Sequence, residues 1–149
     1  MILDEVFVSI LAHRPELSIE ALARTRRLMC AAVPDCVVTG WEEAVPTLRL
    51  PDPADRHVLA AAIHADAQVI VTRNLKDFPV RALAPFGIEA QHPDLFVLGL
   101  IRQNPIAVFE ILRQQQQDLR RNPKTIPQLL GIMERQGLAR SVAELRQQL

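Results

Sequence analysis

The sequence predicts an α/β fold with a short parallel sheet, followed by an all-helical C-terminal region. Three short segments have the composition of buried strands: residues 36–39, 69–72 and 87–90. Segments with helical spacing of apolar residues separate them, and crossover connections of this kind favour parallel strands. From residue 94 onward the apolar residues recur with helical periodicity only. The sheet is therefore expected in the first part of the chain, and helices alone in the second.

Composition and charge limit the class of protein. The chain has 149 residues, of which 49% are hydrophobic, and this is enough for one core-forming domain and short for two. Its formal net charge of +0 gives no global basic field, although a nuclease can hold its substrate through a local basic patch. Cys30 and Cys36 are too few for a disulfide framework or a zinc site, which favours a reducing cytoplasmic location. Neither a signal peptide nor a membrane span is expected.

Two helices are predicted at the N-terminus. Residues 2–13 carry an apolar stripe so wide that we expect this helix to be buried on more than one side. A second helix, over about residues 18–32, begins with Ser18 as its N-cap. The predicted strand over 36–39 follows.

The stretch from residue 50 to 79 is predicted to form a helix, a buried strand and a polar loop. Asp52 and Asp55 stand at the helix start, with Pro53 at the first helical position, and Asn74 and Asp77 follow the strand. Two interpretations remain open. These side chains could cap helical turns, or their oxygens could bind Mg²⁺ or Mn²⁺ at the carboxyl end of the sheet.

The histidines do not suggest a ligand set. His57 and His64 are seven residues apart on the predicted helix, whereas metal-binding pairs on helices prefer a spacing of three or four. We therefore predict a structural or surface role for each of them.

Four sequence stretches resemble a known family. DRHVLAAAI at 55–63, followed by VIVTRNLKDFP at 69–79, is similar to the second half of a PIN domain, the fold of the VapC-like toxin ribonucleases. ILDEV at 2–6 resembles the helix that carries that family's second acidic residue, and the tail from Pro93 resembles the helical C-terminal extension of one subgroup of bacterial PIN toxins. The resemblance implies a PIN-like three-layer α/β/α fold over residues 1–92 and a helical extension over 93–149.

The resemblance also implies a site. Glu5 would be the second acid and Asp55 the third, with Asp52 beside it; Asn74 stands where many members carry an Asp, and Asp77 is the next carboxylate. Glu5, Asp55 and Asp77 are thus the expected catalytic residues. All five side chains are the expected ligands of Mg²⁺ or Mn²⁺.

Basic residues flank this predicted acidic site. In the family interpretation three of them bind RNA phosphates, with an affinity that falls as salt rises: Arg56, Arg73 and Lys76. In the alternative interpretation they neutralise neighbouring acids.

PIN domains open with a strand that ends in an Asp, whereas the resemblance begins here at the helix of Glu5. We therefore expect an N-terminally truncated sheet without the family's first acid, and its unpaired edges favour a homodimer or a hetero-complex. Two functions stay open. One is a metal-dependent endoribonuclease, the toxin of a bacterial toxin–antitoxin system; the other is a catalytically inactive remnant that binds an antitoxin or a second chain. A true start further upstream is a third possibility.

The C-terminal region is predicted to form four helices. The first two cover about residues 95–102 and 105–121, and capping boxes at Thr125–Gln128 and Ser141–Glu144 each begin a further helix. Gly137 is the expected C-terminal cap between these two. Because no catalytic constellation appears here, we expect a packing or partner surface, which could receive an antitoxin segment as a helix in a groove.

Overall fold

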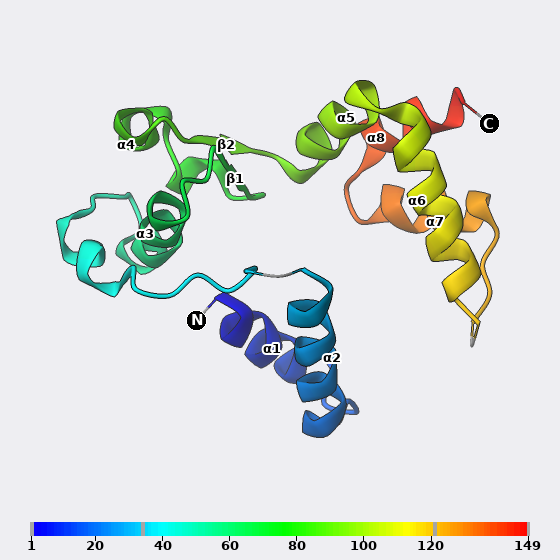
Figure 1. Ribbon diagram of the computed structural model, residues 1–149, viewed down its shortest axis with the longest axis horizontal. Helices are drawn as coiled ribbons and strands as arrows, with labels where there is room; N and C mark the ends of the chain where they lie inside the picture. The colour runs from blue at the N-terminus through cyan, green and yellow to red at the C-terminus, as the bar shows by residue number, and fades with distance from the viewer. Residues whose placement is uncertain (1, 34, 121, 149) are drawn as a thin grey trace. The chain divides into compact units, whose positions relative to one another are not determined.

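The computed structural model describes residues 2–33, 35–120 and 122–148 (Figure 1). Contacts divide the chain into two compact units, Met1–Ala67 and Gln68–Leu149. We describe each unit by itself. The sequence suggests a different boundary, between residues 92 and 93, where the PIN-like region gives way to the helical extension. That boundary stays a prediction.

The first unit opens with helices α1, Ile2–His13, and α2, Ile19–Ala32, which pack side by side (Figure 1). Ser18 is the N-cap of α2 as predicted, because its Oγ accepts the backbone N–H of Ala21 at 3.0 Å. The expected burial of α1 on more than one side is wrong for the described chain. None of its residues is buried, and Val8 is 67% exposed. Helix α2 covers only one face of α1.

The rest of the first unit has no strand among its described residues. It contains the 3₁₀ helices η1, Glu42–Thr47, and η2, Pro53–Asp55, and the helix α3, Arg56–His64. The predicted strand over residues 36–39 is wrong, since this segment is irregular. A strand needs a neighbouring strand for its backbone hydrogen bonds, and the described part of this unit offers none. Trp41, Leu59 and Ala60 are instead buried here.

The second unit contains the sheet. Strand β1, Val69–Val71, pairs in parallel with β2, Glu89–Gln91, in the register Val69↔Glu89. Between them lie η3, Leu75–Asp77, then α4, Val80–Leu83, and η4, Ala84–Phe86; Gly87 follows with φ +67°. This left-handed conformation suits glycine, and the strand begins two residues later than predicted. The predicted α/β fold with a short parallel sheet is confirmed.

Four helices complete the second unit (Figure 1): α5, Pro93–Gln103; α6, Pro105–Asp118; α7, Ile126–Arg135; and α8, Ala139–Arg146. Their buried core is Ile101, Leu112, Leu130, Val142 and Leu145. No single described helix is long and apolar enough to cross a membrane; α5 and α6 would suffice in length and composition only together, as a pair bent by 114°.

Both predicted features of α7 are confirmed. Thr125 Oγ1 accepts the backbone N–H of Gln128 at 3.3 Å, and Gln128 Oε1 accepts the backbone N–H of Thr125 at 2.9 Å, which makes a capping box. Gly137 follows α7 with φ +87° and donates its N–H to the carbonyl of Glu134 at 3.0 Å.

The predicted capping box at Ser141 is wrong. Helix α8 begins at Ala139, so that Ser141 lies inside its first turn, and the cap comes from another helix. The Asp94 carboxylate of α5 accepts the backbone N–H groups of Arg140 at 3.0 Å and Ser141 at 2.8 Å. It also accepts the Ser141 hydroxyl at 2.7 Å. Burial by itself would raise the pKa of Asp94, but these hydrogen bonds hold it below its usual value.

Candidate metal centre

Two carboxylates of the first unit come together at one turn. Asp52 precedes η2 with extended backbone, φ −99° and ψ 115°, and its Oδ1 accepts the N–H of Ala54 at 2.8 Å. Pro53 occupies the first helical position, as predicted. Asp55 ends η2 directly before α3, and it has a carboxylate oxygen within 4.8 Å of one from Asp52.

The capping interpretation of Asp52 is therefore confirmed, and it does not exclude a metal. A carboxylate has two oxygens and about four lone-pair directions, so one hydrogen bond leaves capacity for a ligand bond. Asp52 is exposed and Asp55 is half-buried. Both side chains are consequently accessible to a cation from solvent.

Glu5 lies against a histidine. Its side chain projects from α1 with 57% exposure, and its Oε1 lies 3.4 Å from Nε2 of His57. Among the described residues, Glu5 does not lie within 4.8 Å of both Asp52 and Asp55. It is connected to their turn through His57, which follows Asp55 by two residues.

In the second unit, Asn74 and Asp77 contact each other at the turn that follows β1. The Asn74 side-chain amide donates to the Asp77 carboxylate, and its backbone N–H donates to Thr72 Oγ1 at 3.0 Å. Asn74 precedes η3 without a side-chain capping hydrogen bond. The alternative in which Asn74 caps this turn is therefore wrong. Its amide oxygen and the half-buried Asp77 carboxylate lie at the carboxyl end of a strand.

The three predicted RNA-binding residues differ in their surroundings. The Arg73 guanidinium donates to the carbonyl of Gln136 at the end of α7. Arg56 is half-buried, and among the described residues its Nε has no hydrogen-bond partner. Lys76 is exposed. Of the three predicted phosphate-binding residues, Arg73 is thus already hydrogen-bonded within the second unit.

His57 is the residue whose position the sequence analysis did not anticipate. It is 7% exposed, its Nδ1 lies 2.7 Å from the carbonyl oxygen of Ala54, and its ring centroid lies 6.1 Å from that of Trp41. The spacing of the histidines gave no sign of this arrangement. Its place two residues after Asp55 was the available signal.

The chemistry of these side chains fits a hard divalent cation. Asp52 and Asp55 offer carboxylate oxygens, which suit Mg²⁺ and Mn²⁺, and both metals leave coordination positions to water and phosphate.

Comparison with known proteins identifies the family. Residues 2–76 match the family described as PIN domain. The chain belongs to the PIN domain family. This PIN domain protein continues, over residues 93–147, with a match to the VapC50 C-terminal domain. It is therefore a VapC-like PIN domain protein with a C-terminal extension.

A curated relative shares one stretch with this PIN domain protein. The relative is named "Putative ribonuclease VapC50", from Mycobacterium tuberculosis (strain ATCC 25618 / H37Rv), and is 64% identical over 44 residues. These residues make up 30% of this chain and 26% of the relative, so the match spans about a quarter of the relative's length. No solved structure matches the chain.

Proposed function

We propose that this PIN domain protein is a metal-dependent endoribonuclease that acts as the toxin of a bacterial toxin–antitoxin system. The observation that carries the proposal is the pair of carboxylates, Asp52 and Asp55, within 4.8 Å of each other inside a PIN domain match. The relative's printed name, a ribonuclease, supports the choice of reaction.

The proposed ligands of Mg²⁺ or Mn²⁺ are Glu5, Asp52 and Asp55, to which the family resemblance adds Asn74 and Asp77. Such a cation, when bound, acidifies the attacking water and stabilises negative charge on the phosphodiester. Asp52 and Asp55 would hold their oxygens in place through the turn that η2 and α3 define. Glu5, Asp55 and Asp77 are the proposed catalytic residues.

Basic side chains would hold the RNA backbone. Lys76 is exposed and can contact a phosphate directly. Arg73 has five N–H donors, so its hydrogen bond to Gln136 leaves others for a phosphate. Arg56 is half-buried with its Nε shielded from solvent, so its terminal guanidinium N–H groups would make the phosphate contact. Binding through these residues would weaken as salt rises.

The proposal includes a protein partner and a cytoplasmic location. Large apolar side chains on α1 and α2 are exposed, among them Val8 at 67% and Ile19 at 70%, and an antitoxin or a second copy of the chain would cover such residues. We propose residues 1–92 as the PIN domain and 93–149 as its helical extension. A catalytically inactive module that binds a partner through these helices is the second candidate.

RNA cleavage tests the proposal. The purified chain is incubated with single-stranded RNA in Mn²⁺ or Mg²⁺ and in EDTA, beside Asp55→Asn and the control Asp66→Asn. Asp66 is exposed on the same unit, outside the proposed site, and its φ of +50° suits Asn. We expect cleavage that needs metal and falls more than about 100-fold in Asp55→Asn but not in the control. Equal cleavage by Asp55→Asn would refute the proposed site, and no cleavage by the unmodified chain would favour the inactive module.

A further inference from the structure

The charges of the chain are unevenly divided along the sequence. Residues 93–149 contain eight Lys and Arg against five Asp and Glu, whereas residues 1–92 contain nine against twelve. The helical extension is therefore net positive and the PIN-like region net negative. Such an asymmetry favours a role of the positive region in binding nucleic acid. Which part of the extension binds depends on which basic side chains have no acidic partner.

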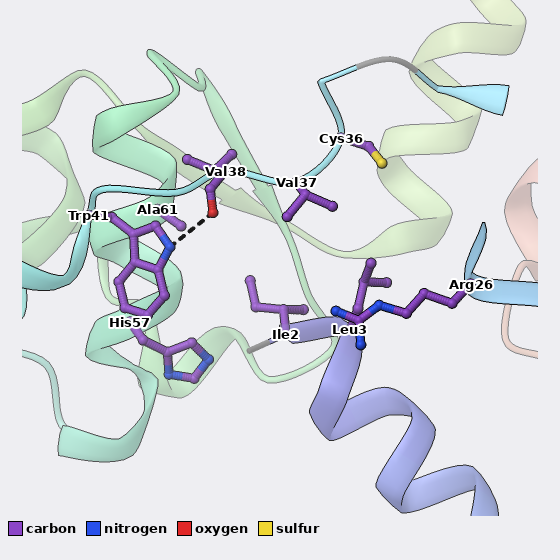
Figure 2. A pocket seen from close by; sticks show the side chains of 9 residues that line it. All are labelled: Ile2, Leu3, Arg26, Cys36, Val37, Val38, Trp41, His57 and Ala61. Atoms are coloured by element: carbon purple, nitrogen blue, oxygen red, sulfur yellow. Dashed lines mark hydrogen bonds between the residues drawn. The ribbon is translucent and has the colours of Figure 1, made fainter. Parts of the chain in front are cut away.

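In the first unit, the arginine beside the cavity already has a partner. This cavity is small and mostly apolar, and Arg26 lines it together with Leu3, Trp41 and His57 (Figure 2). The Arg26 guanidinium pairs with the Asp4 carboxylate, so its charge is balanced. An apolar cavity beside a balanced charge does not suit a phosphate group.

In the second unit, the acidic residues of α7 and α8 are both paired. Arg146 of α8 donates two hydrogen bonds to Glu134 of α7, at 3.2 and 2.8 Å. Glu144 of α8 accepts from an arginine of α5 at 3.3 Å. Two further arginines of these helices, Arg135 and Arg140, are exposed, and neither forms an ion pair with a described residue. Their positive charges are therefore not balanced by α7 or α8.

These two arginines lie on either side of a tight turn. Residues 136–138 connect α7 to α8, and the turn is closed by the N–H of Leu138, which donates to the carbonyl of Met133 at 3.1 Å. Arg135 is the last residue of α7, and Arg140 lies in the first turn of α8. The turn thus carries one exposed guanidinium group on each side.

The same turn contacts the loop that follows β1. The Arg73 guanidinium donates to the carbonyl of Gln136, at the carboxyl end of α7, where free carbonyls and the helix dipole favour a cation. It also lies beside Gly137, because a Cβ at that glycine would be 3.8 Å from Nη2 of Arg73. Arg73 directly precedes Asn74, whose amide donates to the Asp77 carboxylate. The α7–α8 turn is consequently next to two of the proposed metal ligands.

We propose that Arg135 and Arg140 bind backbone phosphates of the RNA substrate beside the turn of Asn74 and Asp77. The inference rests on the proposed function, and it gives the helical extension a part in holding RNA. Guanidinium groups suit phosphate because they can donate two parallel hydrogen bonds to it. A single strand presents a phosphate at every nucleotide, so that each arginine can contact a different one.

RNA binding in EDTA tests this surface without cleavage. Fluorescence anisotropy gives the Kd of the full chain for a labelled single-stranded RNA at several salt concentrations. In the double variant Arg135→Gln, Arg140→Gln the Kd should rise about tenfold at low salt, and the slope of log Kd against log salt should fall by about 1.4, since each phosphate contact on a single strand contributes about 0.7. Both arginines are exposed, so the circular dichroism of the variant should equal that of the unmodified chain.

A second double variant is the matched control. Arg120→Gln with Lys124→Gln removes the same charge from the same extension, but these residues precede α7, whereas Arg135 ends it. Because α7 has 10 residues and is about 15 Å long, the control charges lie at its opposite end. The Kd of the control should change less than about threefold. Equal effects of the two double variants would show that only net charge matters and would overturn the proposal.

The RNA cleavage assay separates this inference from the proposed function. Cleavage by the unmodified chain, with an unchanged Kd in Arg135→Gln, Arg140→Gln, would leave the ribonuclease standing and overturn the inference; an acidic protein segment would then be the better partner for these charges. A raised Kd and a lowered slope, without cleavage by the unmodified chain, would support the RNA surface and count against the ribonuclease. Absence of RNA binding by the unmodified chain would overturn both.

Discussion

The first two helices and the last four are all rich in apolar residues, yet they differ in what they bury. Neither α1 nor α2 has a buried residue among those described, whereas α5 to α8 share a core in which Leu130 is 1% exposed and Val142 0%. Four helices can cover one another's apolar faces, but two helices leave most of theirs uncovered. An apolar stripe on a helix thus predicts that this face will be buried, but it does not predict which part of the chain will bury it.

The polar contacts between helices are likewise exposed in the first region and buried in the second. The Asp4–Arg26 ion pair between α1 and α2 is about half-exposed, with side-chain exposures of 52% and 41%. The contact of Asp94 with Ser141 between α5 and α8 is buried, at 6% and 0% exposure. Exposed ion pairs contribute little to stability, while buried charge-assisted hydrogen bonds contribute more.

The largest effect should follow from opening a cavity in the C-terminal core. Leu130→Ala should lower the free energy of unfolding of residues 93–147 by about 3 kcal/mol, since it removes a fully buried side chain. Hydrogen exchange of peptides from this region in increasing urea measures the change. Val8→Ala in α1 is the matched control, with an expected change within about 0.5 kcal/mol. Equal losses of stability in Leu130→Ala and Val8→Ala would show that α1 is as tightly packed in solution as the C-terminal helices.

A smaller loss should follow from removing the buried charge. Asp94→Asn should destabilise the same region by about 2 kcal/mol at pH 7, because an amide cannot accept the three hydrogen bonds equally well.

The effect should depend on pH. The folded-state pKa of Asp94 is lower than its usual value near 3.8, so its contribution is fully present above that value. It is lost as the pH falls through the lower, folded pKa. The stabilities of the unmodified chain and Asp94→Asn, measured by urea unfolding from pH 7 to 2, should therefore converge at the acid end. A difference that stays constant down to pH 2 would contradict this account.

The smallest effect should come from the helix caps. Thr125→Ala removes the capping box of α7 and should cost about 1 kcal/mol in unfolding of the C-terminal helices. Ser18→Ala removes the equivalent oxygen from α2 and should increase hydrogen exchange in α2 alone, because that helix is not part of a buried core. If Ser18→Ala instead destabilised the whole first unit, α2 would be more tightly packed than its exposure indicates.

Local features of the fold could be predicted because their causes lie within a few residues. Ser18 and Thr125 cap their helices, Gly137 adopts a left-handed conformation after α7, and the β-branched run at 69–71 forms a strand. The segment at 36–39 has a similar composition and is irregular, since a strand depends on a partner elsewhere in the chain.

The contacts of the candidate site also fall into short-range ones, which the sequence predicts, and long-range ones, which it does not. Asp52 and Asp55 are close because they are three positions apart on one turn, and Asn74 contacts Asp77 for the same reason. The contact of Glu5 with His57 joins residues 52 positions apart, and a spacing argument along one helix missed it. The engagement of Arg73 by Gln136 is likewise a long-range contact.

Sequence alone specified the family, the parallel pair of strands, the helical extension and the acidic turn, because each depends on near neighbours or on the identity of quoted motifs. Tertiary structure decided which helix faces are buried, that Asp94 rather than Ser141 caps α8, and that His57 lies against Glu5. These outcomes depend on which distant surfaces meet, and burial and pairing are properties of both surfaces at once.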